Sequence, residues 1–311
     1  MSEPGCDVLV IGASGQDGPY VMSAARRAGL TPLGTSRHGA NGLIQLDPHD
    51  HSAVTRLLDR LRPERLFVLA GQSSVGRSYD CPAETVRSHT IPLLNCLEWV
   101  RLHGPQTRLV YTASGESFGP REAGRPAVET DEFTPVSPYA SAKTMAAVLL
   151  DNYRRTYRLH ASNAFLFNHE SARRGTDFVF GKLLAGLRVL AEGSMTDRVQ
   201  MGDLSVRRDW GYAPDYCEAL LRMSDLATPQ DLILATGHSV QLADAVEALV
   251  AAAGLTMESA VVSGSQQVQA YRPRDEQYAD PSLAVRTIGW ECSTPFPALA
   301  EKLINPPDEY L

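Results

Sequence analysis

The sequence has few cysteines, few aromatic residues and no hydrophobic run long enough for a membrane span. Its five cysteines in 311 residues are scattered and lack Cys-x-x-Cys spacing, so we expect reduced thiols rather than disulfides or a zinc site. The eight histidines show no paired ligand spacing, and no metal is expected. The N-terminus has no basic flank before an apolar run, which predicts a cytoplasmic protein without a membrane partner.

Basic residues are also in deficit. The 29 Lys and Arg against 36 Asp and Glu give a formal net charge of −7, which argues against nucleic acid as a partner. The rest of the composition is that of a globular chain, because 43% hydrophobic and 21% charged residues over this length can build a substantial core.

Short runs rich in Val, Ile and Leu alternate with helical stretches, which predicts a parallel sheet covered by helices on both faces. We therefore predict an α/β fold: a Rossmann-type doubly wound parallel sheet with a smaller C-terminal mixed α/β substrate domain. Expected strands lie near 7–11, 31–35, 43–46, 66–70, 108–112 and 162–167, later helices near 178–191, 213–225 and 241–253, and Pro-rich loops near 272–297. The predicted domains are 1–167 with a returning segment at about 212–253, and 168–211 with 254–311.

The first apolar run leads directly into a loop with glycines at three-residue spacing. Gly12, Gly15 and Gly18 permit a tight strand-to-helix turn, close approach of a pyrophosphate and close helix packing. The helix start then supplies free N–H groups and the positive end of a dipole. We predict a dinucleotide-binding loop; the alternative is a Gly-rich turn without a ligand. The expected contacts are Gly12, Ser14, Gly15, Gln16, Asp17 and Gly18.

A phenol and an ammonium are predicted one helical turn apart, at Tyr139 and Lys143. Ser137 is a suitable N-cap and Pro138 suits the first helical position, so the pair should share one helix face. A nearby cation favours the phenolate, which makes Tyr139 a candidate acid and base for alcohol oxidation. The spacing alone also fits an exposed pair that occurs by chance.

A third motif, Ser-x-Glu-x-x-Gly, begins at Ser114 and contains Glu116. The order of the Gly loop, this motif and the Tyr-x-x-x-Lys pair resembles the extended short-chain dehydrogenase/reductase superfamily. Within that superfamily, residues 12–18, 166–175 and 202–211 resemble GDP-mannose 4,6-dehydratases. The resemblance covers nearly the whole chain.

The expected cofactor follows from the end of the second strand, where Ser36 and Arg37 replace the acidic residue that would bind a ribose diol. A guanidinium can hold a 2′-phosphate, so residues 1–167 are predicted to bind NADP; the alternative is a solvated surface Arg37. By resemblance, further cofactor contacts are expected at Asp47, Leu69, Ala70, Gly71, Tyr139, Lys143, His169 and Arg174.

The resemblance implies a nucleotide-sugar 4,6-dehydratase that converts GDP-mannose or a related GDP-sugar to the GDP-4-keto-6-deoxy sugar. Tyr139 would take the 4-hydroxyl proton while Ser114 hydrogen-bonds the 4-oxygen. Lys143 would hold the nicotinamide ribose and lower the pKa of Tyr139, and Glu116 would remove the carbon 5 proton. Some related dehydratases carry an Asp acid where Gly115 stands, so Glu116 is a candidate for both base and acid.

Substrate anchors are expected, again by resemblance, at Arg208 and Arg272, with Asn168 and Lys182 as further candidates. Trp210 is expected to pack under its own loop. Three alternatives remain. A reductase of the 4-keto-6-deoxy product or a nucleotide-sugar epimerase would share the Gly loop and the Ser, Tyr and Lys, and the short chain slightly favours them. A non-catalytic NADP- or nucleotide-sugar-binding protein would need none of those three.

The chain departs from the family at two places. Glu84 stands where the family has a cofactor-contacting Tyr, and the loop after Arg37 is shorter than the basic loop that builds tetramers in the family. Superfamily members commonly pair through two helices per subunit, one of which corresponds to residues 139–155. Its apolar positions predict a homodimer; the alternative is that they complete the monomer's own core. These positions are Met145, Val148, Leu149 and Leu150.

Overall fold

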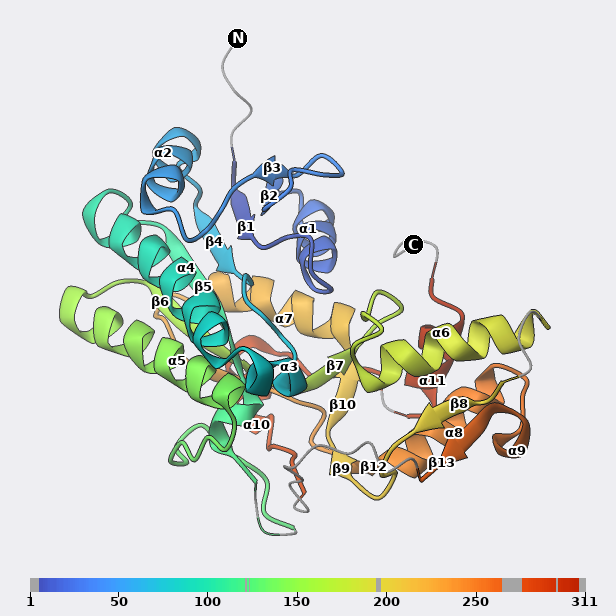
Figure 1. The fold of residues 1–311 in the computed structure, drawn as a ribbon. Helices are drawn as coiled ribbons and strands as arrows, with labels where there is room; N and C mark the ends of the chain where they lie inside the picture. The colour runs from blue at the N-terminus through green and yellow to red at the C-terminus, as the bar shows by residue number, and fades with distance from the viewer. Residues whose placement is uncertain are drawn as a thin grey trace.

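The computed structural model describes residues 6–120, 122, 124–193, 197–264, 276–294 and 296–307. Its centre is a seven-stranded parallel sheet in the order β11-β6-β5-β4-β1-β2-β3 (Figure 1). This order confirms the predicted Rossmann-type α/β fold. The strands are β1 (Val8–Ile11), β2 (Pro32–Ser36), β3 (Ile44–Gln45), β4 (Arg65–Val68), β5 (Arg108–Ser114), β6 (Ala161–Leu166) and β11 (Leu232–Leu234).

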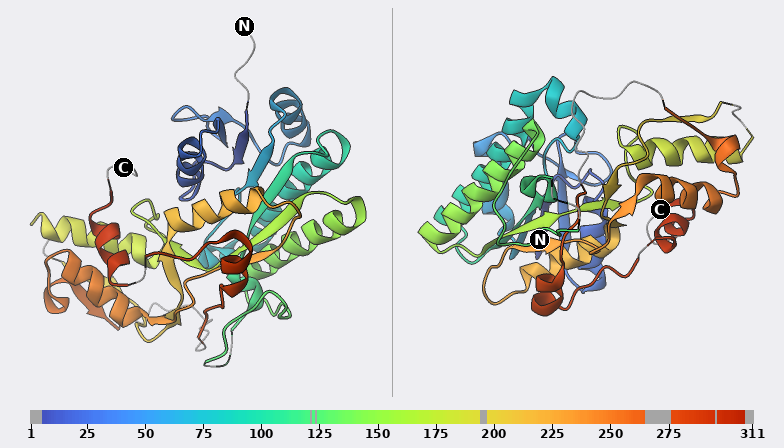
Figure 2. Two further views of the ribbon diagram at one scale, coloured as in Figure 1. Left: turned by 180° about the vertical axis from the view of Figure 1, so that it is seen from behind. Right: turned by 90° about the horizontal axis from the view of Figure 1, so that it is seen from below.

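Strand β1 shows why helices cover both faces of this sheet. Its four residues are fully buried, with Leu9 and Ile11 in one hydrophobic cluster and Val8 and Val10 in the other, because successive strand side chains alternate. The two helical layers are visible from two further directions in Figure 2. The first cluster receives α2 (His51–Leu61), α4 (Pro82–Leu102) and α5 (Pro138–Tyr157); the second receives α1 (Gly18–Arg27), α7 (Ala213–Ser224) and α10 (Ser282–Ile288).

A smaller mixed unit with its own hydrophobic cluster lies beside the sheet (Figure 1). Its helices are α6 (Val179–Ala191), α8 (Leu242–Ala252), α9 (Met257–Ala260) and α11 (Ala298–Ile304). Three two-stranded sheets accompany them: β7 (Asn168–Glu170) with β10 (Trp210–Tyr212), β8 (Val199–Met201) with β13 (Val261–Ser263), and β9 (Arg207–Arg208) with β12 (Val240–Gln241).

Successive elements of the C-terminal part of the chain belong in turn to the sheet and to the smaller unit. Within the predicted returning segment, α7 and β11 pack with the sheet, whereas α8 packs in the third cluster. The expectation of only Pro-rich loops near 272–297 was wrong at α10, since Pro281 stands at the N-cap of this helix and does not interrupt it. Ala284 and Trp290 bury an apolar face on the second cluster.

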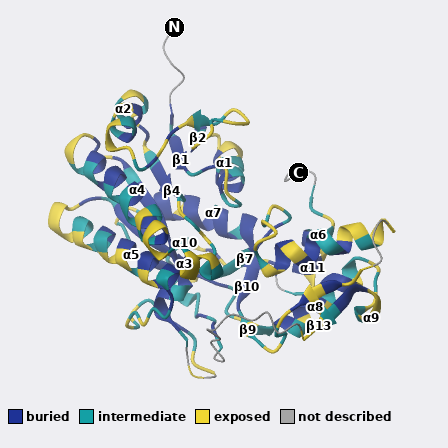
Figure 3. Cartoon of the chain, viewed as in Figure 1, coloured by how far each residue is buried: buried dark blue, intermediate teal, exposed yellow. Residues whose placement is uncertain are grey.

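The outer face of α5 is only partly apolar. Met145 is 53% and Val148 43% exposed, whereas Leu150 is fully buried in the first cluster and Leu149 is half-buried against it. Figure 3 shows exposed and buried residues along this helix. Leu150 was therefore wrongly predicted as an interface residue, because it lies on the inward face of the helix. Across the described residues, no helix combines the length and apolar character that a membrane crossing requires.

Candidate active site

Two adjoining cavities open where the parallel strands end at their carboxyl edge, the usual ligand position in open α/β sheets. The first has a volume of about 740 Å³ and the second about 430 Å³. Both are lined by the segment that follows β4, including Leu69, Gly71, Ser73 and Ser74. A long ligand could therefore extend from one cavity into the other.

The Gly loop forms one wall of the first cavity. Gly12 has a φ of +89°, and a Cβ there would lie 2.7 Å from the backbone of Ala70. A Cβ on Gly18 would lie 2.3 Å from the carbonyl oxygen of Ala13, so only glycine lets α1 pack this closely. The predicted cofactor residues that line this cavity are Gly12, Ser14, Gly15, Ser36, Arg37, Asp47, Leu69, Ala70 and Gly71.

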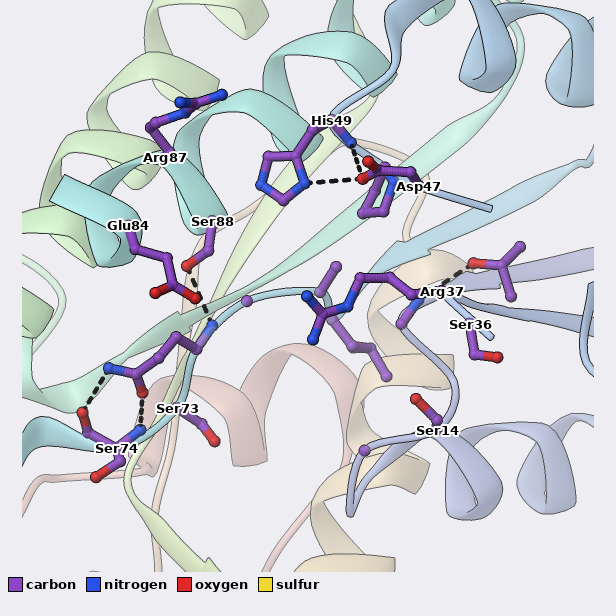
Figure 4. Close-up of a pocket in the computed structure, with 18 of the residues that line it drawn as sticks. Ser14, Ser36, Arg37, Asp47, His49, Ser73, Ser74, Glu84, Arg87 and Ser88 are labelled. Carbon is purple, nitrogen blue, oxygen red and sulfur yellow. Dashed lines mark hydrogen bonds and ion pairs between the residues drawn. The ribbon is translucent and has the colours of Figure 1, made fainter. Parts of the chain in front are cut away.

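Arg37 lies at the end of β2 with its guanidinium directed into the first cavity (Figure 4). Asp47 stands at the rim, where the backbone N–H and the ring of His49 both contact its Oδ1 at 3.0 Å. These hydrogen bonds lower the pKa of Asp47, with a smaller contribution from Arg37. Glu84 also lines this cavity and lies 3.5 Å from Arg77, so a carboxylate and its partner occupy the region where the family has a tyrosine.

The second cavity contains Ser114, Tyr139 and Lys143. Helix α5 begins as predicted: the Ser137 hydroxyl accepts the N–H of Ala140 at 3.0 Å, which fixes the first turn. Lys143 Nζ donates to the carbonyl oxygen of Thr112 at 2.6 Å and lies 5.9 Å from the Tyr139 ring centroid. The phenol and the ammonium therefore share one face of the helix.

Burial dominates the titration of this pair. It raises the pKa of Tyr139 to about 12, although a hydrogen bond with Ser114 acts in the opposite direction. Burial also lowers the pKa of Lys143 to about 7. The net shift of the Tyr139 pKa is therefore opposite to the predicted lowering, because desolvation disfavours the charged form of both groups.

Glu116 lies on a single 3-10 turn, Gly115–Phe118, directly after β5. The Ser114 hydroxyl accepts the N–H of Glu116 at 3.2 Å and so orients the turn. Burial raises the pKa of Glu116, while the charge of Arg208 and a hydrogen bond from Gln277 lower it in part. A carboxyl group with a raised pKa beside Tyr139 is suited to proton transfer near neutral pH.

Gly115 is glycine because Phe167 fills the space beside it. A Cβ at position 115 would lie 2.7 Å from two atoms of the Phe167 ring and 2.9 Å from a third. Phe167 is only 4% exposed and packs in the first hydrophobic cluster. An acidic side chain before Glu116 has no room in this packing.

A half-buried ion-pair network joins the Gly loop to β7. The His169 ring contacts the carbonyl oxygen of Phe167 at 2.7 Å through Nδ1 and the Asp17 carboxylate at 3.1 Å through Nε2. The carbonyl and the carboxylate can only accept hydrogen bonds, so both ring nitrogens donate and the ring is an imidazolium. Burial by itself lowers the pKa of His169, but Asp17 outweighs it and the pKa is raised. Burial likewise raises the pKa of Asp17, but His169 reverses this and holds it at about 2.

Arg174 is held in the same network. Its Nε donates to Glu170 Oε2 at 2.7 Å, so a carboxylate in the same motif fixes the guanidinium. The predicted cofactor residues Asp17, His169 and Arg174 all line the second cavity. Gln16 donates to the carbonyl oxygen of His169 at 3.1 Å and supports the network from the Gly loop.

Among the predicted substrate residues, Asn168 and Arg208 line the second cavity, as does Trp210. Lys182 lies elsewhere, because its Nζ donates to the Gln200 carbonyl oxygen at 2.7 Å and ties α6 to β8. Arg272 falls outside the described residues. Trp210 is 5% exposed and packs edge-on against Phe180 at 5.2 Å, as expected for a residue under its loop.

Comparison with known proteins agrees with this geometry. A family model described as GDP-mannose 4,6 dehydratase matches residues 9–303. The chain is 32% identical to GDP-mannose 4,6 dehydratase 1 of Arabidopsis thaliana, over 96% of this chain and 88% of that protein. It is 30% identical to GDP-mannose 4,6-dehydratase of Vibrio cholerae, over 91% of this chain and 88% of that protein. The chain belongs to the GDP-mannose 4,6-dehydratase family.

The fold of this family member is also found among solved structures. RMD from Pseudomonas aeruginosa, solved in complex with NADPH, superposes with a TM-score of 0.83 at 20% identity and covers 98% of this chain and 99% of that one. At this identity the likeness concerns the fold.

The two sequence runs most specific to GDP-mannose 4,6-dehydratases lie side by side in the structure. Strands β7 and β10 pair in parallel, with Trp210 opposite Asn168 and Gly211 opposite His169. Asp209, fully buried before β10, accepts the backbone N–H groups of Thr236 and Gly237 at 2.9 and 3.0 Å. The family motifs thus build one wall of the second cavity together.

Among the residues of this cavity that sequence reasoning missed are His89, from α4, and Phe167. Their only signals in the sequence are a polar residue in a predicted helix and an aromatic residue within the run 166–175. Neither signal relates its residue to Tyr139 by spacing.

Proposed function

We propose that this protein is an NADP-dependent nucleotide-sugar 4,6-dehydratase that converts GDP-mannose or a related GDP-sugar to the GDP-4-keto-6-deoxy sugar. One observation carries the proposal: Ser114, Tyr139 and Lys143 share a cavity with the carboxyl group of Glu116, whose pKa is raised by desolvation. An epimerase or a ketone reductase uses the first three groups. Only elimination needs a carboxylate to remove the carbon 5 proton.

The residues of the first cavity fit NADP. Gly12 and Gly15 line this cavity without a side chain, which leaves room for a pyrophosphate beside the loop, and Arg37 lines the same space as Ser36. We assign the 2′-phosphate to Arg37 and the adenine to the neighbourhood of Asp47. Bound NADP would supply a hydride acceptor for carbon 4 and later a hydride donor for carbon 6.

The protein's own groups move the protons. Tyr139 accepts the proton of the 4-hydroxyl, and Ser114 donates a hydrogen bond to the developing 4-keto oxygen. That ketone acidifies carbon 5, so Glu116 removes the carbon 5 proton and returns it to the carbon 6 hydroxyl, which leaves as water. Carbon 5 must regain a proton when hydride returns to carbon 6, and the proton that Tyr139 took from the 4-hydroxyl balances this gain. The steric exclusion of a side chain at Gly115 supports one carboxyl group in both roles.

Substrate binding is assigned to the wall formed by the two family motifs. Arg208 from β9 is proposed to bind the diphosphate and Asn168 from β7 the sugar, with Arg272 as a second diphosphate ligand. Lys182 is not included because it is bound to the Gln200 carbonyl group.

The test is to offer a panel of nucleotide sugars to the purified protein with NADP and to search the products by mass spectrometry for loss of one water. Dehydration of a GDP-hexose is expected. A new product of unchanged mass, resolved from the substrate by chromatography, indicates an epimerase, and a gain of two hydrogens by a GDP-4-keto-6-deoxy sugar offered with NADPH in place of NADP indicates a reductase. Glu116→Gln should retain NADP binding and lose elimination, because an amide cannot accept the carbon 5 proton. Wild-type dehydration by this variant would remove Glu116 as the base.

We also propose a cytoplasmic homodimer. The exposed Met145 and Val148 on α5, with Leu102 of α4 at 57% exposed, support an interface between these helices and those of a second copy. The five cysteines are all free, which suits a reducing compartment.

A further inference from the structure

His89 is a buried histidine that the proposed reaction does not use. It projects from α4, is 2% exposed and lines the second cavity with Tyr139 and Lys143. Its ring meets the Tyr139 ring edge-on, at a centroid distance of 5.5 Å and an angle of 79°. The imidazole therefore packs directly on the phenol that is proposed to transfer the substrate proton.

The same ring holds the segment that follows β4. His89 Nε2 contacts the carbonyl oxygen of Gln72 at 2.7 Å, so Nε2 carries the proton. The neighbouring Ser88 hydroxyl accepts the N–H of Gln72 at 3.1 Å. Two consecutive side chains of α4 thus bind both backbone polar groups of one residue. Gln72 belongs to residues 69–74, the cofactor segment, which follows β4 and lines both cavities.

Gly71 shows how closely the ring is seated. Its φ is +152°, and a Cβ there would lie 2.2 Å from two atoms of the His89 ring. Only glycine admits the imidazole at this position. The His89 ring therefore lies directly against the backbone of the cofactor segment as well as being hydrogen-bonded to it.

The charge state of His89 points away from proton transfer. Burial and the charge of Lys143 hold its pKa well below the usual histidine value, so the ring is neutral at physiological pH. Its Nδ1 is buried and has no hydrogen-bond partner among the described residues. An unsatisfied buried nitrogen costs stability, and its presence beside a reacting group calls for a functional reason.

We propose that His89 is a positioning residue that fixes the distance between the cofactor segment and the Tyr139 phenol, and so controls hydride transfer at carbon 4. This inference rests on the proposed function, in which the proton and hydride leave the substrate together. The Nε2 bond holds the cofactor side of the reaction, and the ring edge holds the phenol side. A shift of the order of 1 Å between the two sides could slow the step by about 100-fold.

Two substitutions separate the hydrogen bond from simple packing. His89→Gln keeps an N–H donor at the reach of Nε2, whereas His89→Leu removes it and leaves the Gln72 carbonyl group unsatisfied. A matched control is His160→Leu, because His160 Nε2 makes the same kind of bond, to the Leu226 carbonyl oxygen at 2.8 Å, and lines neither cavity.

The measurement is the transient formation of NADPH on mixing enzyme, NADP and nucleotide sugar, with hydrogen or deuterium at carbon 4. His89→Leu should slow hydride transfer about 10- to 100-fold and raise the isotope effect on turnover, and His89→Gln should recover most of the rate. His160→Leu should change the melting temperature but not the isotope effect. An unchanged hydride rate in His89→Leu, or equal loss in both His89 variants, would overturn the proposal.

Calorimetric titration with NADP gives a second arm that needs no turnover. His89→Leu should bind NADP more weakly than His89→Gln, because the cofactor segment has lost its anchor. If the wild type transforms no nucleotide sugar, the proposed function fails while this titration still decides whether His89 holds the segment. Equal NADP affinities in the two variants would refute the anchoring.

Discussion

The contact between Gly115 and Phe167 determines whether Gly115→Ala raises or lowers the free energy of unfolding. Gly115 has no positive φ, so alanine fits its backbone and would by itself stabilise the protein by about 0.4–1 kcal/mol through the unfolded state. In the folded protein, however, the new Cβ would lie 2.7 Å from the Phe167 ring. Overpacking of a buried site costs about 1–3 kcal/mol, so Gly115→Ala should be net destabilising.

A double-mutant cycle isolates the contact. Phe167→Leu removes the ring atoms that the Cβ would meet, so Gly115→Ala should become neutral or stabilising in that background. The expected coupling is about 1–3 kcal/mol, measured from urea midpoints at constant m-value. The steric argument would be refuted if Gly115→Ala stabilised the wild type, or if the effects of the two substitutions added to within about 0.5 kcal/mol. An acidic side chain could then fit at position 115.

Three further predictions concern the cofactor, the assembly and the pH dependence of stability. NADP should bind more tightly than NAD, and Arg37→Asp should invert this preference because it replaces a phosphate partner with a repulsive charge; equal wild-type affinities by calorimetry would show that Arg37 only faces solvent. Met145→Glu combined with Val148→Glu should convert a dimer to a monomer in light scattering; a monomeric wild type contradicts the interface, and a tetramer contradicts the argument from the short loop. Burial raises the pKa of Asp209 from its ordinary 3.8 to about 6. Its contribution to stability is therefore complete below the unfolded value and is lost as the pH rises through 6. The stability difference between wild type and Asp209→Asn should fall by on the order of 3 kcal/mol between pH 4 and pH 7, and a difference independent of pH would contradict the raised pKa.

Local sequence rules were enough for the elements that present the site. Gly12 and Gly18 were predicted from spacing, and each is required by a backbone approach that any Cβ would block. Ser137 was predicted as an N-cap, and its hydroxyl accepts the N–H of Ala140 at 3.0 Å. These features depend on residues within one turn or on one strand-to-helix connection, so the sequence contains all the information that they need.

Contacts between distant segments were not accessible in the same way. Lys182 has the chemistry of a phosphate ligand, but the packing of α6 on β8 directs its Nζ to the Gln200 carbonyl oxygen. His89 and Tyr139 are separated by one strand, a 3-10 turn and a loop in the sequence, and nothing in their spacing indicates that the rings meet. Leu150 was misplaced for a similar reason, since helical periodicity does not say which apolar face meets the sheet.

The Tyr139 and Lys143 motif predicted where the two side chains lie but not the direction of their pKa shifts. Their spacing correctly placed a phenol and an ammonium on one face of α5, and from this a lowered phenol pKa was expected. The direction of the pKa is set by burial, which depends on where α5 meets the carboxyl edge of β5 and β6. Lys143 Nζ already donates to the Thr112 carbonyl oxygen, and further hydrogen bonds from its ammonium would favour the charged form. Under the proposed function, the ribose diol of NADP would offer such acceptors, and the charge proposed to activate Tyr139 would then depend on the cofactor as well as on the helix.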